Sequence, residues 1–327
     1  MSTTLVDRHL LFVTGKGGTG KTTVAAALAT MSAAAGRRTL VCEMDAKGAL
    51  AAALGAGAEA TGFDPVEVRP NLFAMSMNTE DSLREYIRVI ARVPFVGRIG
   101  PLARTFDFVA DAAPGVKEIL AVGKVCWEAK ERHYDLVIVD AEASGHVVAQ
   151  LESPRVIRDL VRVGMVREQV QWMLDLLGDA RRTGLVVVTT PEELPVTESI
   201  ELVERVRATT DVDVAAIVAN RVPSQWFPPT DAAVLERLGG PSVATSLALA
   251  VDRPAGDVAA VLEAARDAAR RRAGAVEHLD HLRAGLAAAG VTRRVPVVLV
   301  PEAAASTSVA APPLVDAVAT ALSMELA

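Results

Sequence analysis

Short apolar runs alternate with segments of helical periodicity along most of the chain. The runs are rich in Val, Leu and Ile, which is typical of buried strands. They cover Leu10–Thr14, Thr39–Glu43, Leu72–Met77, Leu136–Asp140, Leu185–Thr190, Val212–Asn220 and Val295–Val300. Because helical segments separate them, the order indicates repeated βαβ units. The pattern predicts an α/β fold with a doubly wound, mostly parallel sheet.

Two connections are too long for simple crossovers between neighbouring strands. They run from Asn78 to Tyr134 and from His146 to Asp179. Their helical patterns cover Glu80–Val93, Gly115–Arg132, Arg155–Val163 and Val166–Leu177. We expect an inserted helical subdomain, about residues 79–133 and 147–180, within a single domain that spans residues 1–327. Two more helices are expected at Asp257–Ala289 and Leu314–Met324.

Composition narrows the classes of function. The chain is 51% apolar and carries a formal charge of −6, which argues against a nucleic-acid binder because such a protein needs a basic surface. Its two cysteines, Cys42 and Cys126, form no CxxC pair, so neither a disulfide framework nor a zinc site is expected. Neither a signal peptide nor an apolar stretch of about 18 residues is apparent, so we expect a cytoplasmic protein that is not integral to a membrane.

The strongest motif follows the first apolar run. It fits the phosphate-loop pattern G-x-x-x-x-G-K-[ST] and lies between a strand and an alanine-rich helix, where backbone N–H groups can surround phosphate oxygens. Lys21 is expected on the β- and γ-phosphates and the Thr22 hydroxyl on Mg²⁺. The sequence therefore predicts a nucleoside-triphosphate site. Its expected residues are Gly15, Lys16, Gly17, Gly18, Thr19, Gly20, Lys21, Thr22 and Thr23.

Lys16 narrows the class of phosphate loop. Its spacing resembles the deviant Walker-A motif, K-G-G-x-G-K-[ST], of the arsenite-pump and tail-anchored-protein targeting ATPases and their relatives. In that family this lysine reaches the nucleotide of the partner subunit. The resemblance implies a dimer that closes on ATP, with Lys16 and Lys21 neutralising phosphate charge; a solvated Lys16 is the alternative.

Two carboxylates resemble the switch residues of this branch. Asp45 matches the family's D-P-A-H aspartate, which orients the attacking water, although Lys47 and Gly48 depart from the motif. Asp45 could instead cap a helix. Asp140 ends an apolar strand in the Walker-B manner and is expected to hold Mg²⁺. The following segment resembles D-x-x-x-T/S-G-H but has Glu142 and Ala143 in place of two prolines, and His146 is either a switch residue or polar surface.

Weaker matches point to adenine. Asn220 and Arg221 resemble the family's N-R element, whose Asn reads the base edge, and an amide offers both a donor and an acceptor for that purpose. Pro301 lies in a segment that resembles the loop on the other side of the base. Together they favour ATP over GTP.

The resemblance extends over Leu10–Pro301 and is closest to single-loop bacterial members that occur as paired paralogues. It implies an ATP-hydrolysing homodimer or heterodimer whose closure rearranges a helical surface for a hydrophobic or membrane-protein client. Arsenite transport is not expected, because a metalloid site needs a thiolate cluster. The alternative is a nucleotide-binding regulatory or scaffold subunit of a heterodimer with weak hydrolysis, which the departures at Lys47, Gly48, Glu142 and Ala143 motivate.

Overall fold

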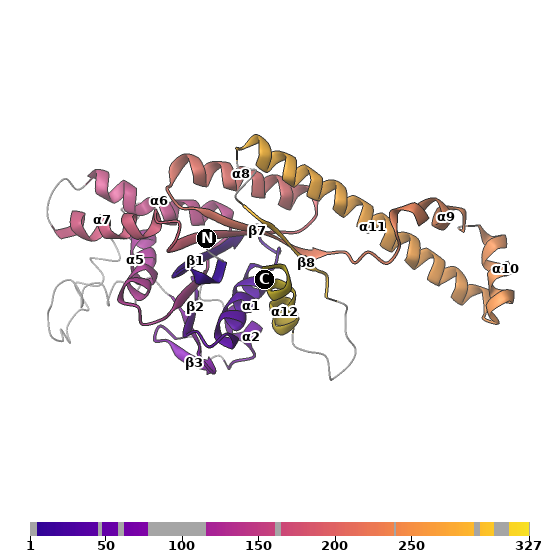
Figure 1. Ribbon diagram of the computed structural model, residues 1–327, viewed down its shortest axis with the longest axis horizontal. Coiled ribbons are helices and arrows are strands. Elements are labelled where there is room, and N and C mark those ends of the chain that lie inside the picture. Colours follow the sequence, from indigo (N-terminus) through magenta and orange to yellow (C-terminus); the bar gives the residue numbers. More distant parts are fainter. Residues whose placement is uncertain are drawn as a thin grey trace.

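An eight-stranded sheet lies at the centre of the molecule, with helices on both faces (Figure 1). The computed structural model describes residues 5–44, 48–57, 62–77, 116–160, 165–238, 240–290, 295–303 and 314–326. The strands are β1 (Leu10–Gly15), β2 (Thr39–Glu43), β3 (Val66–Arg69), β4 (Leu72–Ser76), β5 (Leu136–Asp140), β6 (Thr183–Thr189), β7 (Val214–Val222) and β8 (Val297–Pro301).

The sheet order is β3-β4-β2-β5-β1-β6-β7-β8, and every pair is parallel except β3 with β4. The predicted α/β class with a mostly parallel sheet is confirmed. All residues of β1, β2, β5 and β6 are buried, which explains why these strands are continuous apolar runs in the sequence. The edge strand β3 was not predicted, because its four residues alternate charged and apolar side chains and lie half-exposed or exposed.

One face of the sheet is covered by α1 (Lys21–Ala34), α2 (Ala49–Leu54) and α12 (Leu314–Leu326) (Figure 1). Their small side chains allow close packing: six consecutive residues of α1, from Val24 to Ala29, have no exposed surface. Burial of this kind stabilises the fold by roughly 25 cal/mol for each Å² of apolar surface removed from water. It also fixes the start of α1, and therefore the phosphate loop before it, against the middle of the sheet.

The opposite face is covered by α5 (Val116–Glu131), α6 (Ser144–Leu160), α7 (Met165–Leu177), α8 (Glu193–Thr209) and the C-terminal half of α11 (Ala255–Ala288) (Figure 1). Within the two ranges expected to form an inserted subdomain, α5, α6 and α7 contribute Val125, Leu151 and Met173 to the same core as the sheet. The helix expected at Glu80–Val93 lies outside the described residues.

The prediction for α6 was wrong at its start. The helix begins at Ser144 and continues through Pro154, whereas the sequence suggested a start at Arg155. A proline inside a helix removes one backbone hydrogen bond. Here the buried side chains of Val147, Val148 and Leu151 attach the first turns of α6 to the core, and tertiary packing overrides the local signal.

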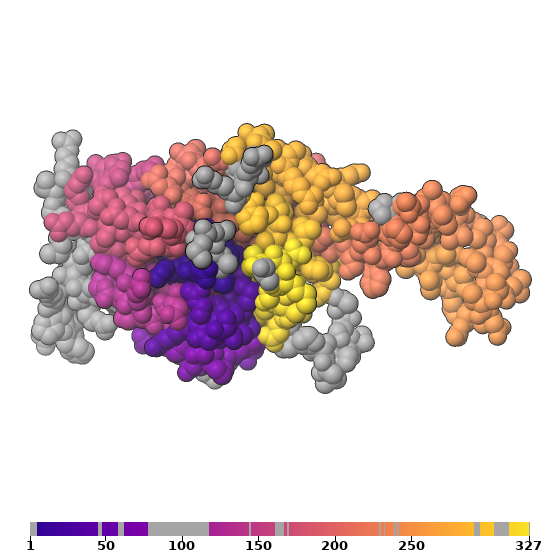
Figure 2. All heavy atoms as spheres, in the orientation of Figure 1, coloured from indigo at the N-terminus to yellow at the C-terminus, as the bar shows by residue number. Residues whose placement is uncertain are grey.

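A helical arm projects from the β8 side of the molecule (Figures 1 and 2). It consists of α9 (Ala232–Arg237), α10 (Pro241–Val251) and the N-terminal half of α11. The other half of α11 packs on α8, where Leu279, Leu282 and Leu286 are buried. The sequence predicted the long helix but not that half of it leaves the body. Among the helices that the structure describes, none combines the length and the hydropathy that crossing a bilayer requires.

Candidate functional site

Three glycines of the phosphate loop, Gly15, Gly18 and Gly20, have backbone conformations that other residues rarely adopt. Gly15 has φ +149°, and a Cβ there would lie 2.0 Å from the carbonyl oxygen of Val188 on β6. Gly20 has φ +90°, and its Cβ would lie 2.4 Å from Asn220 Nδ2. Gly18 also has a left-handed backbone, at φ +87°. The pattern of glycines is therefore set by backbone conformation and by close approach to β6 and β7.

Hydrogen bonds close the loop from within. The Thr19 hydroxyl donates to the Lys16 carbonyl oxygen at 2.9 Å, and Lys21 Nζ donates to the same oxygen at 3.4 Å. From β7, Asn220 Nδ2 donates to the Thr19 carbonyl oxygen at 2.9 Å. These bonds leave Gly17 and Gly18 exposed at the tip, with α1 starting directly behind them. A rigid turn at a helix N-terminus is a site for anions such as phosphate.

Asp140 and Thr22 form the polar centre of the site. The Thr22 hydroxyl donates to Asp140 Oδ2 at 2.7 Å, which joins α1 to the end of β5. Asp140 is 6% exposed, and its other oxygen, Oδ1, is buried without a hydrogen-bond partner. Burial raises the pKa of Asp140 to about 6, against the lowering effects of the Thr22 hydroxyl and the Lys21 charge. A buried carboxylate oxygen without a partner fits Mg²⁺, which is commonly held by one or two carboxylates together with substrate phosphates.

Lys16 has a partner that the sequence did not reveal. Its Nζ lies 2.5 Å from Glu198 Oε1 on α8, and the two side chains are 27% and 32% exposed. In the structure Lys16 therefore pairs with a residue of its own chain. No sequence signal joins the two residues, because they are 182 positions apart and Glu198 lies in an ordinary amphipathic helix.

The remaining predicted residues lie around the same edge of the sheet. Asn220 is buried, and its Oδ1 accepts a hydrogen bond from the Arg221 N–H. Arg221 is exposed with φ +56°, and Pro301 ends β8 opposite Val222. Thr23 is half-buried in the first turn of α1. Asp45 and Lys47 lie outside the described residues, so their proposed roles stay predictions.

The segment that resembles D-x-x-x-T/S-G-H, residues 140–146, joins β5 to α6. Thr14 on β1 donates through its hydroxyl to the Glu142 carbonyl oxygen at 2.9 Å, so a bond from the neighbouring strand holds the backbone where the family has proline. His146 has a 76% exposed side chain, with its Nδ1 3.6 Å from a Glu142 oxygen. The His146 side chain is thus exposed on the first turn of α6, where it is compatible with either expected role, as a switch residue or as polar surface.

Glu43, the last residue of β2, also lies at this edge of the sheet and was not predicted as a site residue. It is 3% exposed and lies directly opposite Asp140 in the register of β2 and β5. A charged residue that ends an apolar strand is a signal that could have been used, because buried carboxylates are rare unless they are paired. The family motif instead marks Asp45, two positions further along the chain.

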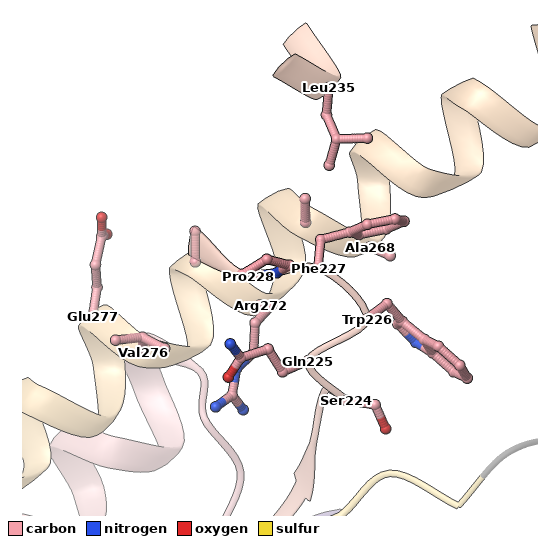
Figure 3. A pocket seen from close by; sticks show the side chains of 12 residues that line it. Ser224, Gln225, Trp226, Phe227, Pro228, Leu235, Ala268, Arg272, Val276 and Glu277 are labelled. Atoms are coloured by element: carbon pink, nitrogen blue, oxygen red, sulfur yellow. The ribbon is translucent and has the colours of Figure 1, made fainter. Parts of the chain in front are cut away.

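A second hollow lies at the base of the arm, apart from the phosphate loop (Figure 3). It encloses about 370 Å³ between α11, α9 and the segment that follows β7. Trp226, Phe227, Leu235 and Val276 are among the residues that line it (Figure 3). Trp226 is 73% exposed. The Met173 side chain, by contrast, is buried in the core, and Lys130 Nζ lies 4.4 Å from the centroid of the Trp172 ring.

Comparison with known proteins gives one consistent result. A family model described as "Anion-transporting ATPase" matches residues 8–177. "ATPase BagA" of Mycobacterium tuberculosis is 29% identical over 230 residues, which cover 67% of each chain. "ATPase get3" of Neurospora crassa is 29% identical over 202 residues, covering 61% of this chain and 57% of the fungal protein. "ATPase GET3" of Podospora anserina is 26% identical over 249 residues, covering 65% and 72%.

Proposed function

This chain belongs to the anion-transporting ATPase family, and from that membership we propose a dimeric ATPase that closes on ATP. The family and its relatives named as ATPases make the chain an ATP-binding hydrolase. The observation that carries the proposal is the convergence of Lys21, Thr22 and Asp140 at the carboxyl ends of two adjacent strands, β1 and β5. In open parallel sheets, this edge is where ligands bind.

Each residue of this centre has a distinct task. The loop's backbone N–H groups and Lys21 bind the β- and γ-phosphates. Thr22 and Asp140 hold Mg²⁺, which neutralises charge that develops on the phosphate oxygens. Phosphoryl transfer needs little covalent help from a protein, so orienting the attacking water is the main remaining task. We assign that task to Asp45, which follows the end of β2 by two residues.

The adenine site is proposed at the ends of β7 and β8. Asn220 supports the phosphate loop through Thr19, and its amide retains a second N–H beside the one used for that bond. Arg221 and Pro301 lie on the exposed strand ends next to it. This arrangement supports a base that packs between the two strand ends, with Asn220 in contact with both the loop and the base.

Dimerisation is proposed to use Lys16. In an ATP-bound pair of subunits, homodimeric or with a related paralogue, Lys16 leaves Glu198 and reaches the partner's nucleotide. The pair is a third exposed on both sides and contributes little to stability, so ATP phosphates can compete for the lysine. A cation that arrives with the partner would couple hydrolysis to association, because it stabilises charge in the transition state.

A hydrophobic client or partner is proposed to contact the arm. Six of the twelve large hydrophobic side chains that lie exposed in the described part of the chain fall between residues 226 and 276. They include Trp226 at 73% and Leu249 at 83% exposure. The α10 sequence, PSVATSLALAV, carries no charge, so its exposed face favours an uncharged apolar segment.

Two measurements test this function. Phosphate release from MgATP, followed together with light scattering, should show turnover and a doubling of mass with a non-hydrolysable ATP analogue. Turnover by a species that stays monomeric under the same conditions would contradict the dimeric mechanism. A photo-crosslinker at Leu249 should label a purified apolar transmembrane peptide in a nucleotide-dependent manner, whereas one at Glu263 on α11 should not. Equal labelling from both positions would contradict a client site on the arm.

A further inference from the structure

The carboxylate of Glu43 ties the end of β2 to the start of α2. Oε2 accepts a hydrogen bond from the Gly48 N–H at 3.1 Å, and Oε1 accepts from the Ala49 N–H at 3.0 Å and the Leu50 N–H at 3.4 Å. Ser76 on β4 donates its hydroxyl to Oε2 at 3.0 Å. Glu43 therefore uses a single side chain to hold three consecutive backbone N–H groups of another element.

These bonds satisfy the carboxylate completely. A carboxylate has about four acceptor positions, and Glu43 uses four. No position remains for a metal ion, which separates Glu43 from its neighbour Asp140, whose Oδ1 has no partner. The first N–H groups of a helix also carry partial positive charge, so they stabilise the buried negative charge.

Contacts hold the described chain on both sides of residues 45–47. Met44, directly after Glu43, donates its N–H to the Asp140 carbonyl oxygen at 3.1 Å. Gly48, at the other end, is held by the Glu43 carboxylate and has φ +73°. Asp45 lies between these two anchors. The chain is thus tethered before Asp45, at Met44, to β5, which carries Asp140, and after Asp45, at Gly48, to the Glu43 side chain.

We propose that Glu43 is a positioning residue for ATP hydrolysis, which fixes the segment that carries Asp45 against the strand that carries Asp140. The inference rests on the proposed role of Asp45. It goes beyond a helix cap, because a cap on a six-residue helix would affect stability alone. A tether on the water-orienting segment controls how well that segment is placed, and displacement by about 1 Å can cost about 10²-fold in rate.

Three variants test the tether. In Glu43→Gln, an NH₂ group replaces one acceptor oxygen and faces N–H donors. In Glu43→Asp, the charge stays but the side chain is one methylene too short to reach Gly48. Ser76→Ala is the matched control, because it removes a hydrogen bond to the same carboxylate without releasing the loop.

Glu43→Gln and Glu43→Asp should each lower kcat about tenfold or more while KM for MgATP stays within about threefold. Ser76→Ala should stay within about threefold of the unchanged protein in both constants. A kcat for Glu43→Gln within threefold of the unchanged protein would overturn the proposal, and so would an equal loss in Ser76→Ala. A kcat for Glu43→Asp equal to that of the unchanged protein would also overturn it, since that result would assign the effect to the charge of the side chain and not to its length.

Hydrogen–deuterium exchange gives a readout that needs neither turnover nor a variant. In the unchanged protein without nucleotide, the Gly48, Ala49 and Leu50 amides should exchange much more slowly than in an unstructured peptide. Exchange at the unstructured rate would overturn the tether even if the protein hydrolyses ATP. Conversely, failure of the unchanged protein to hydrolyse MgATP would reject the proposed function while protected amides still supported the Glu43 contacts.

Discussion

Lys16 of the phosphate loop and Glu198 of α8 form an ion pair with Nζ 2.5 Å from Oε1. The contact joins the phosphate loop, next to its exposed tip, to α8, which lies on the face of the sheet opposite to α1. Partly exposed pairs of this kind contribute about 0–1 kcal/mol. Glu198 therefore gives Lys16 a defined position in the single chain without preventing it from moving to a stronger anion.

Replacing Lys16 by Ala should reduce turnover about 10³-fold, because cations that stabilise the transferred phosphoryl group contribute on that scale. Nucleotide binding by the same subunit should remain within about fivefold, since Lys21 and the loop backbone are unchanged. Steady-state phosphate release and titration calorimetry measure the two quantities. Lys130→Ala, an exposed lysine on α5, is the control and should match the unchanged protein. Normal turnover in Lys16→Ala would show that the lysine has no part in catalysis.

Replacing Glu198 by Gln should strengthen ATP-dependent association by about two- to fivefold, because an intrachain competitor worth up to about 1 kcal/mol is weakened. The free energy of unfolding should change by less than about 0.5 kcal/mol. Analytical ultracentrifugation with a non-hydrolysable analogue measures the association constant. Weaker association in this variant would indicate that Glu198 acts across the interface and not as a competitor.

Two glycines of the loop should respond differently to a methyl group. Gly15→Ala should cost about 3 kcal/mol or more in unfolding free energy, because φ is +149° and the Cβ would meet the Val188 carbonyl at 2.0 Å. Gly17→Ala should cost less than about 0.5 kcal/mol, since no atom lies within 4 Å of its Cβ. Urea denaturation of the two variants compares them directly. Equal losses would contradict the described close approach of β1 and β6.

Asp140→Asn should stabilise the protein without nucleotide and Mg²⁺ by about 1–2 kcal/mol at pH 8, because it removes a buried charge with an unpartnered oxygen. The pKa of Asp140 is raised from 3.8 to about 6, first by burial. The folded protein thus holds this proton more strongly than the unfolded chain. The gain should be absent below pH 4, grow between pH 4 and 6, and stay constant above. Thermal unfolding across this range tests it, and a variant less stable at pH 8 would contradict it. The same substitution should abolish turnover.

Local sequence was sufficient for the phosphate loop and for most of the sheet. The loop from Gly15 to Thr22 is specified by glycine conformation and by short-range bonds, so its pattern survives in the sequence. The buried strands β1, β2 and β5 could equally be predicted from the sequence, because burial on both faces requires continuous apolar residues. Asp140 was found because it ends such a run and also begins a segment that resembles D-x-x-x-T/S-G-H.

Other features depend on residues that only the fold brings together. Glu198 meets Lys16 across 182 positions, and Arg69 on the unpredicted strand β3 meets Asp316 on α12 at 2.7 Å. Neither pair has a local signature. The predicted start of α6 was wrong for a related reason. The cost of Pro154 inside the helix is offset by tertiary packing of its first turns, which forms only in the folded protein.

Periodicity and turn residues thus predicted which groups lie at the carboxyl ends of the strands, where the nucleotide is proposed to bind. They did not predict which contacts hold those groups in place. Period-2 and period-3.6 patterns record whether a position is buried, and a glycine records backbone conformation, because both act within a few residues. The Ser76 bond to Glu43, the resting partner of Lys16 and the direction of the arm depend on distances between elements, which packing of the whole sheet and its helices determines.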